Sequence, residues 1–175
     1  MKLLGLLRHA KSDWSDSRKA DIERGLNDRG RRGATLMGEH IARHGVAWNK
    51  VIASPAERVR DTLASALPNA EVDFDRRLYL ASAETICEVV AELGGDSKAV
   101  LVSGHNPGLQ DMLFTLVAPA DENALFDEAK VKFPTASFAV YQLAIDSWAD
   151  LGPECGTLVH FARPRDFDAE LGPEG

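Results

Sequence analysis

The chain has 175 residues, 45% of them hydrophobic, which fits one domain with a sizeable apolar core. Its formal net charge of -7 argues against general affinity for nucleic acid or an anionic membrane, whose phosphates would repel it. Because we find neither a membrane-spanning apolar run nor a signal peptide, we expect a soluble cytoplasmic protein. Cys87 and Cys155 lack the spacing of a zinc site or a disulfide framework.

The first predicted element is a short strand over residues 3–7. This apolar run, interrupted only by Gly5, lacks polar alternation, so it predicts a strand buried on both faces. Arg8 and His9 follow at once, where the crevices of open α/β sheets bind ligands. The alternative is an ordinary strand end with solvated side chains. A polar loop follows over residues 11–24.

Helices and strands then alternate. Asn27 is typical of a helix N-cap and Gly45 of a C-cap, so they delimit the first helix. The later elements are predicted as strand 51–53, helix 57–67, strand 72–74, a helix within 78–93, strand 98–103, helix 109–117 and strands 137–143 and 156–161. This order predicts an α/β fold: a single-domain, three-layer sandwich with a mainly parallel sheet of about six strands and helices on both faces.

The predicted domain covers residues 1–163. Residues 118–133 are polar and acidic, which indicates a connection and not a domain boundary. Pro164, Pro173 and several charges predict a poorly ordered tail over residues 164–175.

Four polar residues are predicted to converge at one edge of the sheet. Arg8 and His9 follow the first strand, and His105 follows strand 98–103. Strand 51–53 ends at the same edge and leads into a helix that carries Arg58. Guanidinium groups suit phosphate oxygens. One imidazole can attack phosphorus while the other hydrogen-bonds the transferring oxygens, so the pattern predicts a phosphoryl-transfer site.

Three segments resemble signatures of the histidine phosphatase superfamily. Leu7-Arg8-His9-Ala10 is similar to its Arg-His-Gly motif, residues 54–62 to its second-arginine segment, and residues 103–106 to its second-histidine segment. They occur in the family order. Within the superfamily, residues 8–12, residues 24–30 and the compact length most resemble the SixA-type phosphohistidine phosphatases.

The resemblance implies a phosphoglycerate mutase-like fold and a phosphatase in which His9 becomes phosphorylated. Arg8, Arg58 and His105 would line the phosphate pocket. It also implies a reaction that uses no metal and no other cofactor. The further residues expected to contact the substrate are Lys11, Ser12, Arg24 and Asn106. For Lys11 and Ser12, a solvated loop position remains the alternative.

Two carboxylates that other members of the superfamily use as proton donors are missing here. The matching positions are residues 78–81 and Asn106. The imidazole of a phosphohistidine needs less help from an acid than an alkoxide does, so the absence favours a phosphoramidate or another good leaving group. The leading substrate is phosphohistidine on a protein, such as a phosphotransfer domain. Asp13, Asp16 and Asp21 of the polar loop are alternative acids. A small-molecule phosphomonoesterase and a non-catalytic phosphate-binding module are the competing functions.

Three further histidines are candidate ligands. His40 and His44 lie four residues apart on a predicted helix, which permits a metal pair, but a solvated helix face is the simpler interpretation. His160 lies in a strand pattern and is interpreted as a structural histidine.

Overall fold

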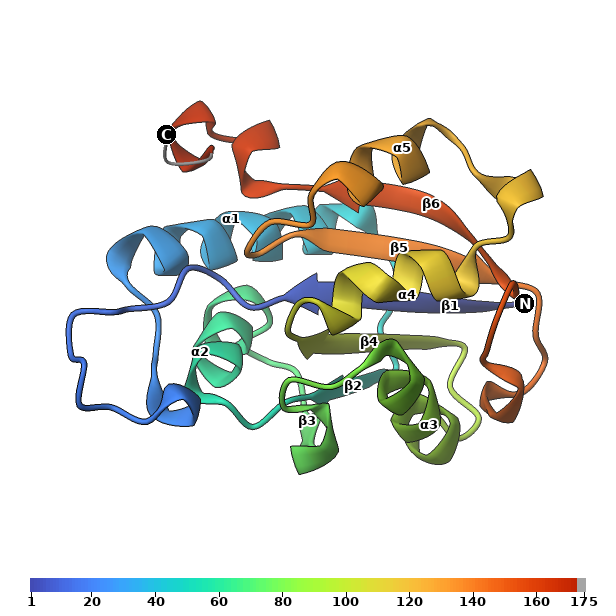
Figure 1. The fold of residues 1–175 in the computed structure, drawn as a ribbon, viewed down its shortest axis with the longest axis horizontal. Helices are drawn as coiled ribbons and strands as arrows, with labels where there is room; N and C mark the ends of the chain where they lie inside the picture. Colours follow the sequence, from blue (N-terminus) through green and yellow to red (C-terminus); the bar gives the residue numbers. More distant parts are fainter. Residues whose placement is uncertain (173–175) are drawn as a thin grey trace.

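The first strand lies in the middle of a six-stranded sheet in the computed structural model, which describes residues 1–172 (Figure 1). The strand order is β3-β2-β4-β1-β5-β6. The four strands β1, β2, β3 and β4 run parallel to one another, whereas β5 is antiparallel to both its neighbours, β1 and β6. The strands are β1 (Lys2–Arg8), β2 (Lys50–Ala53), β3 (Val72–Phe74), β4 (Ala99–Gly104), β5 (Phe138–Leu143) and β6 (Gly156–Ala162). The predicted mainly parallel α/β sandwich is confirmed.

Helices cover both faces of the sheet and divide the core in two. Residues of α1 and α2 pack with one face, and residues of α3, α4 and α5 pack with the other. The helices are α1 (Asp28–His44), α2 (Glu57–Ala66), α3 (Ala83–Leu93), α4 (Gly108–Leu116) and α5 (Ala124–Val131). Asn27 caps α1 by accepting a hydrogen bond from the backbone of Gly30, and Gly45 ends it in the left-handed conformation, as predicted.

The continuous apolar pattern of β1 follows from its place between two layers of helices. Leu4 and Leu6 join the core under α3, α4 and α5, while Leu7 joins the core under α1 and α2. A strand buried on both faces has no side that selects polar residues. Gly5 is needed for space, since a Cβ there would lie 2.7 Å from the Trp48 ring.

The register of the sheet brings three strand ends to one edge. Arg8 of β1 pairs with Gly104 of β4, and Ala53 of β2 pairs with Ser103 of β4. The three strands are parallel, so the residues that follow each of them leave the sheet at the same level.

Two regions differ from the prediction. Residues 118–133 contain the helix α5, which Asn123 caps and which buries Phe126. Residues 164–172 are not a poorly ordered tail: they form two short 3-10 turns, and Arg32 pairs with Asp168 at the second turn. The remaining residues of the predicted tail, 173–175, lie outside the described part of the chain.

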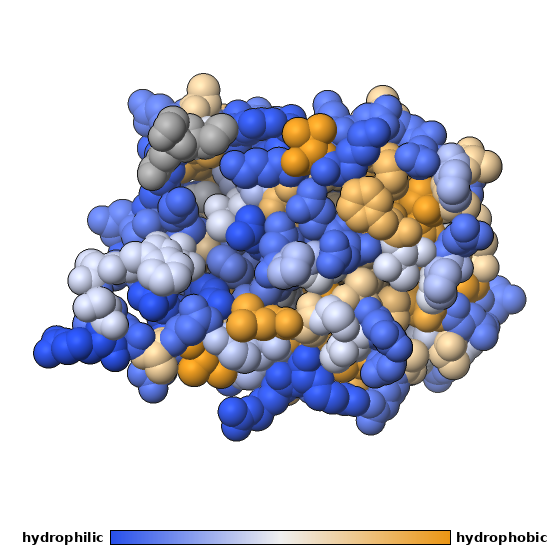
Figure 2. All heavy atoms as spheres, viewed as in Figure 1, coloured by the Kyte–Doolittle hydropathy of each residue, from blue (hydrophilic) through white to orange (hydrophobic). Residues whose placement is uncertain are grey.

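The face of the molecule seen in Figure 2 has a hydrophilic end and a more apolar region. Hydrophilic residues cover the end that carries the loops after β1, while apolar residues gather over α4 and α5. Within residues 1–172, no helix is long and apolar enough to cross a membrane.

Candidate active site

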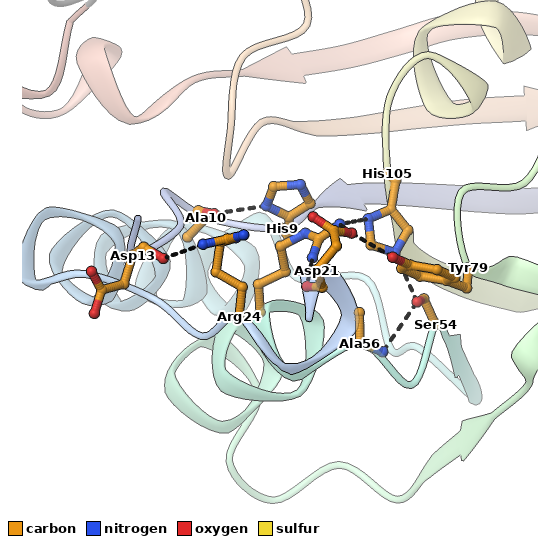
Figure 3. A network of polar contacts seen from close by, with 10 residues as sticks. His9, Ala10, Asp13, Asp21, Arg24, Ser54, Ala56, Tyr79 and His105 are labelled. Carbon is orange, nitrogen blue, oxygen red and sulfur yellow. Dashed lines mark hydrogen bonds and ion pairs between the residues drawn. The ribbon is translucent and has the colours of Figure 1, made fainter. Parts of the chain in front are cut away.

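The four residues predicted to converge lie together at the carboxyl edge of the sheet. The ring centroids of His9 and His105 are 5.4 Å apart, and Nη2 of Arg58 lies 3.4 Å from Nδ1 of His105. The exposed fractions are 8% for His9, 5% for Arg58 and 3% for His105. Arg8 is the last residue of β1, directly before His9. Figure 3 shows the two histidines within one polar network, and their ring planes are tilted by 54°.

The hydrogen bond of His9 fixes which ring nitrogen is free. Nδ1 lies 2.7 Å from the carbonyl oxygen of Ala10, and because a carbonyl only accepts, Nδ1 carries the proton. Nε2 therefore keeps its lone pair. Burial lowers the pKa of His9 to about 3, and the charge of Arg8 adds to this effect while the bond to Ala10 opposes it. At neutral pH His9 is an uncharged imidazole, the form required of a nucleophile.

Thr62 holds the backbone beside His9. Its hydroxyl accepts a hydrogen bond of 2.9 Å from the backbone N–H of Ala10 and donates one of 2.7 Å to the carbonyl of Arg58. One side chain thus joins the segment after β1 to the first turn of α2.

His105 is also neutral in this arrangement. A guanidinium only donates, so Nδ1 of His105 accepts from Arg58, and Nε2 carries the proton towards Ser54 Oγ at 2.8 Å. Burial, followed by the charge of Arg58, lowers the pKa of His105 to about 4. The edge of the Tyr79 ring packs against the imidazole. An anion bound next to His105 would raise its pKa and make Nδ1 a donor.

Arg8 and Arg58 lie close enough for their positive charges to interact, and one hydrogen-bond donor of Arg8 has no partner within residues 1–172. Nη1 of Arg8 donates to the carbonyl of Phe133 at 3.0 Å, but its buried Nε has no hydrogen-bond partner within residues 1–172. Burial and then the charge of Arg58 lower the pKa of Arg8. A buried guanidinium with an unpartnered donor and a second guanidinium nearby form a place for an anion with several acceptor oxygens.

Asp21 lies opposite Arg58 in this site. Arg58 donates to the backbone carbonyl of Asp21 at 2.8 Å and to its carboxylate at 3.0 Å, and the hydroxyl of Tyr79 donates to the same carboxylate oxygen. The bond from Tyr79, and then the one from Arg58, keep the pKa of Asp21 below its usual value. Of the three loop aspartates that the sequence offers as acids, only Asp21 lines the cavity that His9 also lines, called the His9 cavity below. Asp13 accepts a hydrogen bond from the backbone N–H of Ser15, and Asp16 forms an ion pair with Arg18.

Of the four remaining predicted residues, two line the cavity beside His9 and two do not. Lys11 and Ser12 line the same cavity of about 240 Å³. Its other lining residues are Arg8, His9, Trp14, Asp21, Arg58 and Thr135. Arg24 is buried beneath the Trp14 ring, 3.7 Å from its centroid, and so supports the loop. Asn106 bonds the Phe133 carbonyl and the backbone N–H of Gln110, outside the residues that line this cavity.

Sequence reasoning did not single out Ser54 or Tyr79 as site residues. Ser54 is fully buried and bonds His105, and Tyr79 bonds Asp21. Tyr79 lies in the stretch that was noted only for its missing carboxylate, and nothing in the local pattern marks it. Ser54 lies within the second-arginine segment, which was the available signal.

The three other histidines form a cluster of their own. His40 and His44 do not lie on a solvated face: both are half-buried and pack against His160, with 2.7 Å between Nε2 of His40 and Nε2 of His160. The Phe167 ring packs on His40. Within residues 1–172, no group of three or more His, Cys, Asp or Glu side chains is arranged to hold a metal ion.

Comparisons with known proteins agree with this geometry. A model of the histidine phosphatase superfamily (branch 1) matches residues 4–79. An uncharacterized protein of Mycobacterium tuberculosis is 36% identical over 160 residues, covering 91% of this chain and 100% of that protein. A structure assigned as phosphohistidine phosphatase SixA from Nakamurella multipartitia is 29% identical, with a TM-score of 0.81, and covers 93% of this chain and 96% of that one. Another SixA assignment, from Agrobacterium tumefaciens, is 25% identical with a TM-score of 0.74, covering 93% and 98%.

Proposed function

The chain belongs to the histidine phosphatase superfamily, and from this premise we propose that it hydrolyses phosphohistidine on proteins through a phospho-His9 intermediate, without a metal ion. The observation that carries the proposal is the neutral, buried His9 whose Nε2 is unprotonated beside Arg8, Arg58 and His105.

The reaction would proceed in two displacements at phosphorus. The phosphoryl oxygens bind the unpartnered Nε of Arg8 and the guanidinium of Arg58, with Asp21 giving up its place on Arg58. Nε2 of His9 attacks phosphorus, and the bond to the leaving imidazole nitrogen breaks as that nitrogen takes a proton from a water molecule. Water then attacks phospho-His9 and releases inorganic phosphate. The charge that develops on the oxygens is stabilised by both arginines and by His105 once it is protonated.

The substrate assignment follows from the state of the nearby carboxylate. Because Tyr79 and Arg58 hold the pKa of Asp21 low, Asp21 is ionised at neutral pH and is a poor proton donor. A leaving group that departs as an imidazole suits such a site better than an alkoxide does. The similar structures from Nakamurella multipartitia and Agrobacterium tumefaciens carry the SixA assignment, which supports the same substrate class.

The test uses a phosphohistidine peptide and p-nitrophenyl phosphate as substrates. We expect turnover of the peptide, phosphate on His9 after trapping at alkaline pH, and complete loss of turnover in His9→Ala; His160→Gln, outside the site, serves as the matched control. An active His9→Ala variant would refute the mechanism. Equal rates on simple alkyl phosphates and on the peptide would refute the leaving-group argument. If neither substrate is turned over and no intermediate is trapped, the chain is a phosphate-binding module.

A further inference from the structure

A second cavity lies beside the His9 cavity and shares a wall with it. Its volume is about 330 Å³, within the range of ligand sites. Arg8, Lys11 and Thr135 line both cavities. The other walls come from the start of α1, the loop before β5 and the turns after β6. In Figure 1 the C-terminal segment lies over the N-terminal half of α1, where it closes this side of the molecule.

Among residues 1–172, the charged side chains that line the second cavity are all positive. They are those of Arg8, Lys11, Arg29, Lys132, Arg163 and Arg165, and no Asp or Glu of this part of the chain lines it. This contrasts with the formal net charge of -7 for the whole chain. Cations gathered around a concave site repel one another and focus the potential that attracts an anion.

Several of these charges lack a partner. Arg163 pairs with Asp166 at 3.1 Å, but the side chains of Lys11, Lys132 and Arg165 make no ion pair or hydrogen bond within residues 1–172. The cations available to a ligand therefore come from three separate segments of the chain. A site assembled in this way binds a charged group from several sides.

Local packing fixes two walls of the cavity. Gly30 lies against the chain after His9 so closely that a Cβ would be 2.2 Å from the carbonyl oxygen of Lys11. The C-terminal segment is fixed on α1 because Arg32 pairs with Asp168 and with Glu170, the latter at 3.2 Å. The walls are thus held by contacts that leave Lys132 and Arg165 unused.

We propose that this cavity is a second anion-binding subsite, which receives an acidic side chain of the phosphorylated protein next to its phosphohistidine. The inference rests on the proposed function. Because Arg8 forms a wall of both cavities, a carboxylate and a phosphoryl group on neighbouring residues of one substrate can occupy them together. Paired charges of this kind select between partners, and an acidic partner would otherwise be repelled by the negative chain.

The first measurement compares two phosphohistidine peptides that differ only by glutamate or glutamine beside the phosphohistidine. For the unaltered protein we expect a KM about tenfold lower for the glutamate peptide, equivalent to one favourable charge contact, with similar kcat. In Lys132→Ala/Arg165→Ala the ratio of the two KM values falls to about one. The control Lys98→Ala/Arg43→Ala removes two cations from outside both cavities and keeps the tenfold ratio.

A second measurement does not depend on turnover. An unphosphorylated glutamate peptide should shift the amide NMR signals of Gly30 and Gly33, and Lys132→Ala/Arg165→Ala should abolish the shift. If phosphohistidine peptides are not hydrolysed but this shift is seen, the proposed function fails and the subsite stands. Equal KM values for both peptides in the unaltered protein overturn the subsite. If the small molecule propane-1,3-bisphosphate binds more tightly than both peptides, the claim that the anion is an acidic side chain of a protein is wrong.

Discussion

The hydroxyl of Thr62 offers a sharp test of how the site is held together. Thr62→Val keeps the size and β-branching of the side chain but removes the group that accepts from the Ala10 N–H. Thr62 is 0% exposed and Ala10 is 1% exposed, so water does not replace the lost acceptor. A buried N–H left unpaired costs about 1–3 kcal/mol. The carbonyl of Arg58 loses its hydrogen bond from the hydroxyl but remains within helix α2. We therefore assign the loss of stability to the unpaired N–H of Ala10.

We therefore expect Thr62→Val to lower the free energy of unfolding by about 2 kcal/mol. For a domain of this size the melting temperature should fall by roughly 4–8 °C. The carbonyl of Ala10 also anchors Nδ1 of His9, so a displaced Ala10 should lower kcat/KM by roughly tenfold, which corresponds to about 1.4 kcal/mol of transition-state stabilisation.

Urea unfolding and steady-state kinetics measure the two effects, and Thr62→Ser, which retains the hydroxyl, is the matched control. Thr62→Ser should recover most of the stability and activity. A Thr62→Val protein that unfolds within about 0.3 kcal/mol of the unaltered chain would show that the Ala10 N–H finds another partner, and the reasoning would be wrong.

Three further predictions address charge. Asp21→Asn removes the carboxylate that pairs with Arg58, so inorganic phosphate should inhibit the enzyme several-fold more tightly. Weaker inhibition would contradict the idea that Asp21 and phosphate compete for Arg58. With pKa values of about 3 and 4, His9 and His105 should show no NMR titration between pH 5 and 8 in the free protein, and midpoints near 6.5 would disprove their neutrality. The fold holds the pKa of His160 at about 4 against 6.5 when unfolded, so its contribution to stability is complete above pH 6.5 and is lost as the pH falls towards 4. His160→Gln should reduce this acid loss in denaturation curves, and an unchanged slope would exclude the contribution.

Sequence reasoning located the residues that follow directly from strands. Arg8, His9 and His105 were placed correctly at one sheet edge because strand ends and parallel pairing fix that edge. Arg58 followed because its helix begins immediately after β2. Such positions depend on local patterns and on one rule of topology.

The parts that were missed depend on contacts between distant segments. Asp21 reaches Arg58 and Tyr79 from a loop whose path no local pattern specifies. The turns of residues 164–172 are ordered by pairing with Arg32, which lies 136 positions from Asp168. His40 packs with His160, which lies 120 positions away in the sequence. The sequence predicted a solvated helix face for His40, but tertiary packing against His160 half-buries it.

The bond between Arg8 and the Phe133 carbonyl joins residues 125 positions apart and therefore sets an order of events during synthesis. At about 5–20 residues per second, the ribosome needs roughly 6–25 s to reach Phe133 after making Arg8. During this interval the apolar β1 has left the ribosome without its neighbour β5, and until β4 is made it has no strand partner at all. The segment that carries His9 is therefore among the first to emerge, and its apolar side chains stay without their final neighbour until β5 is made.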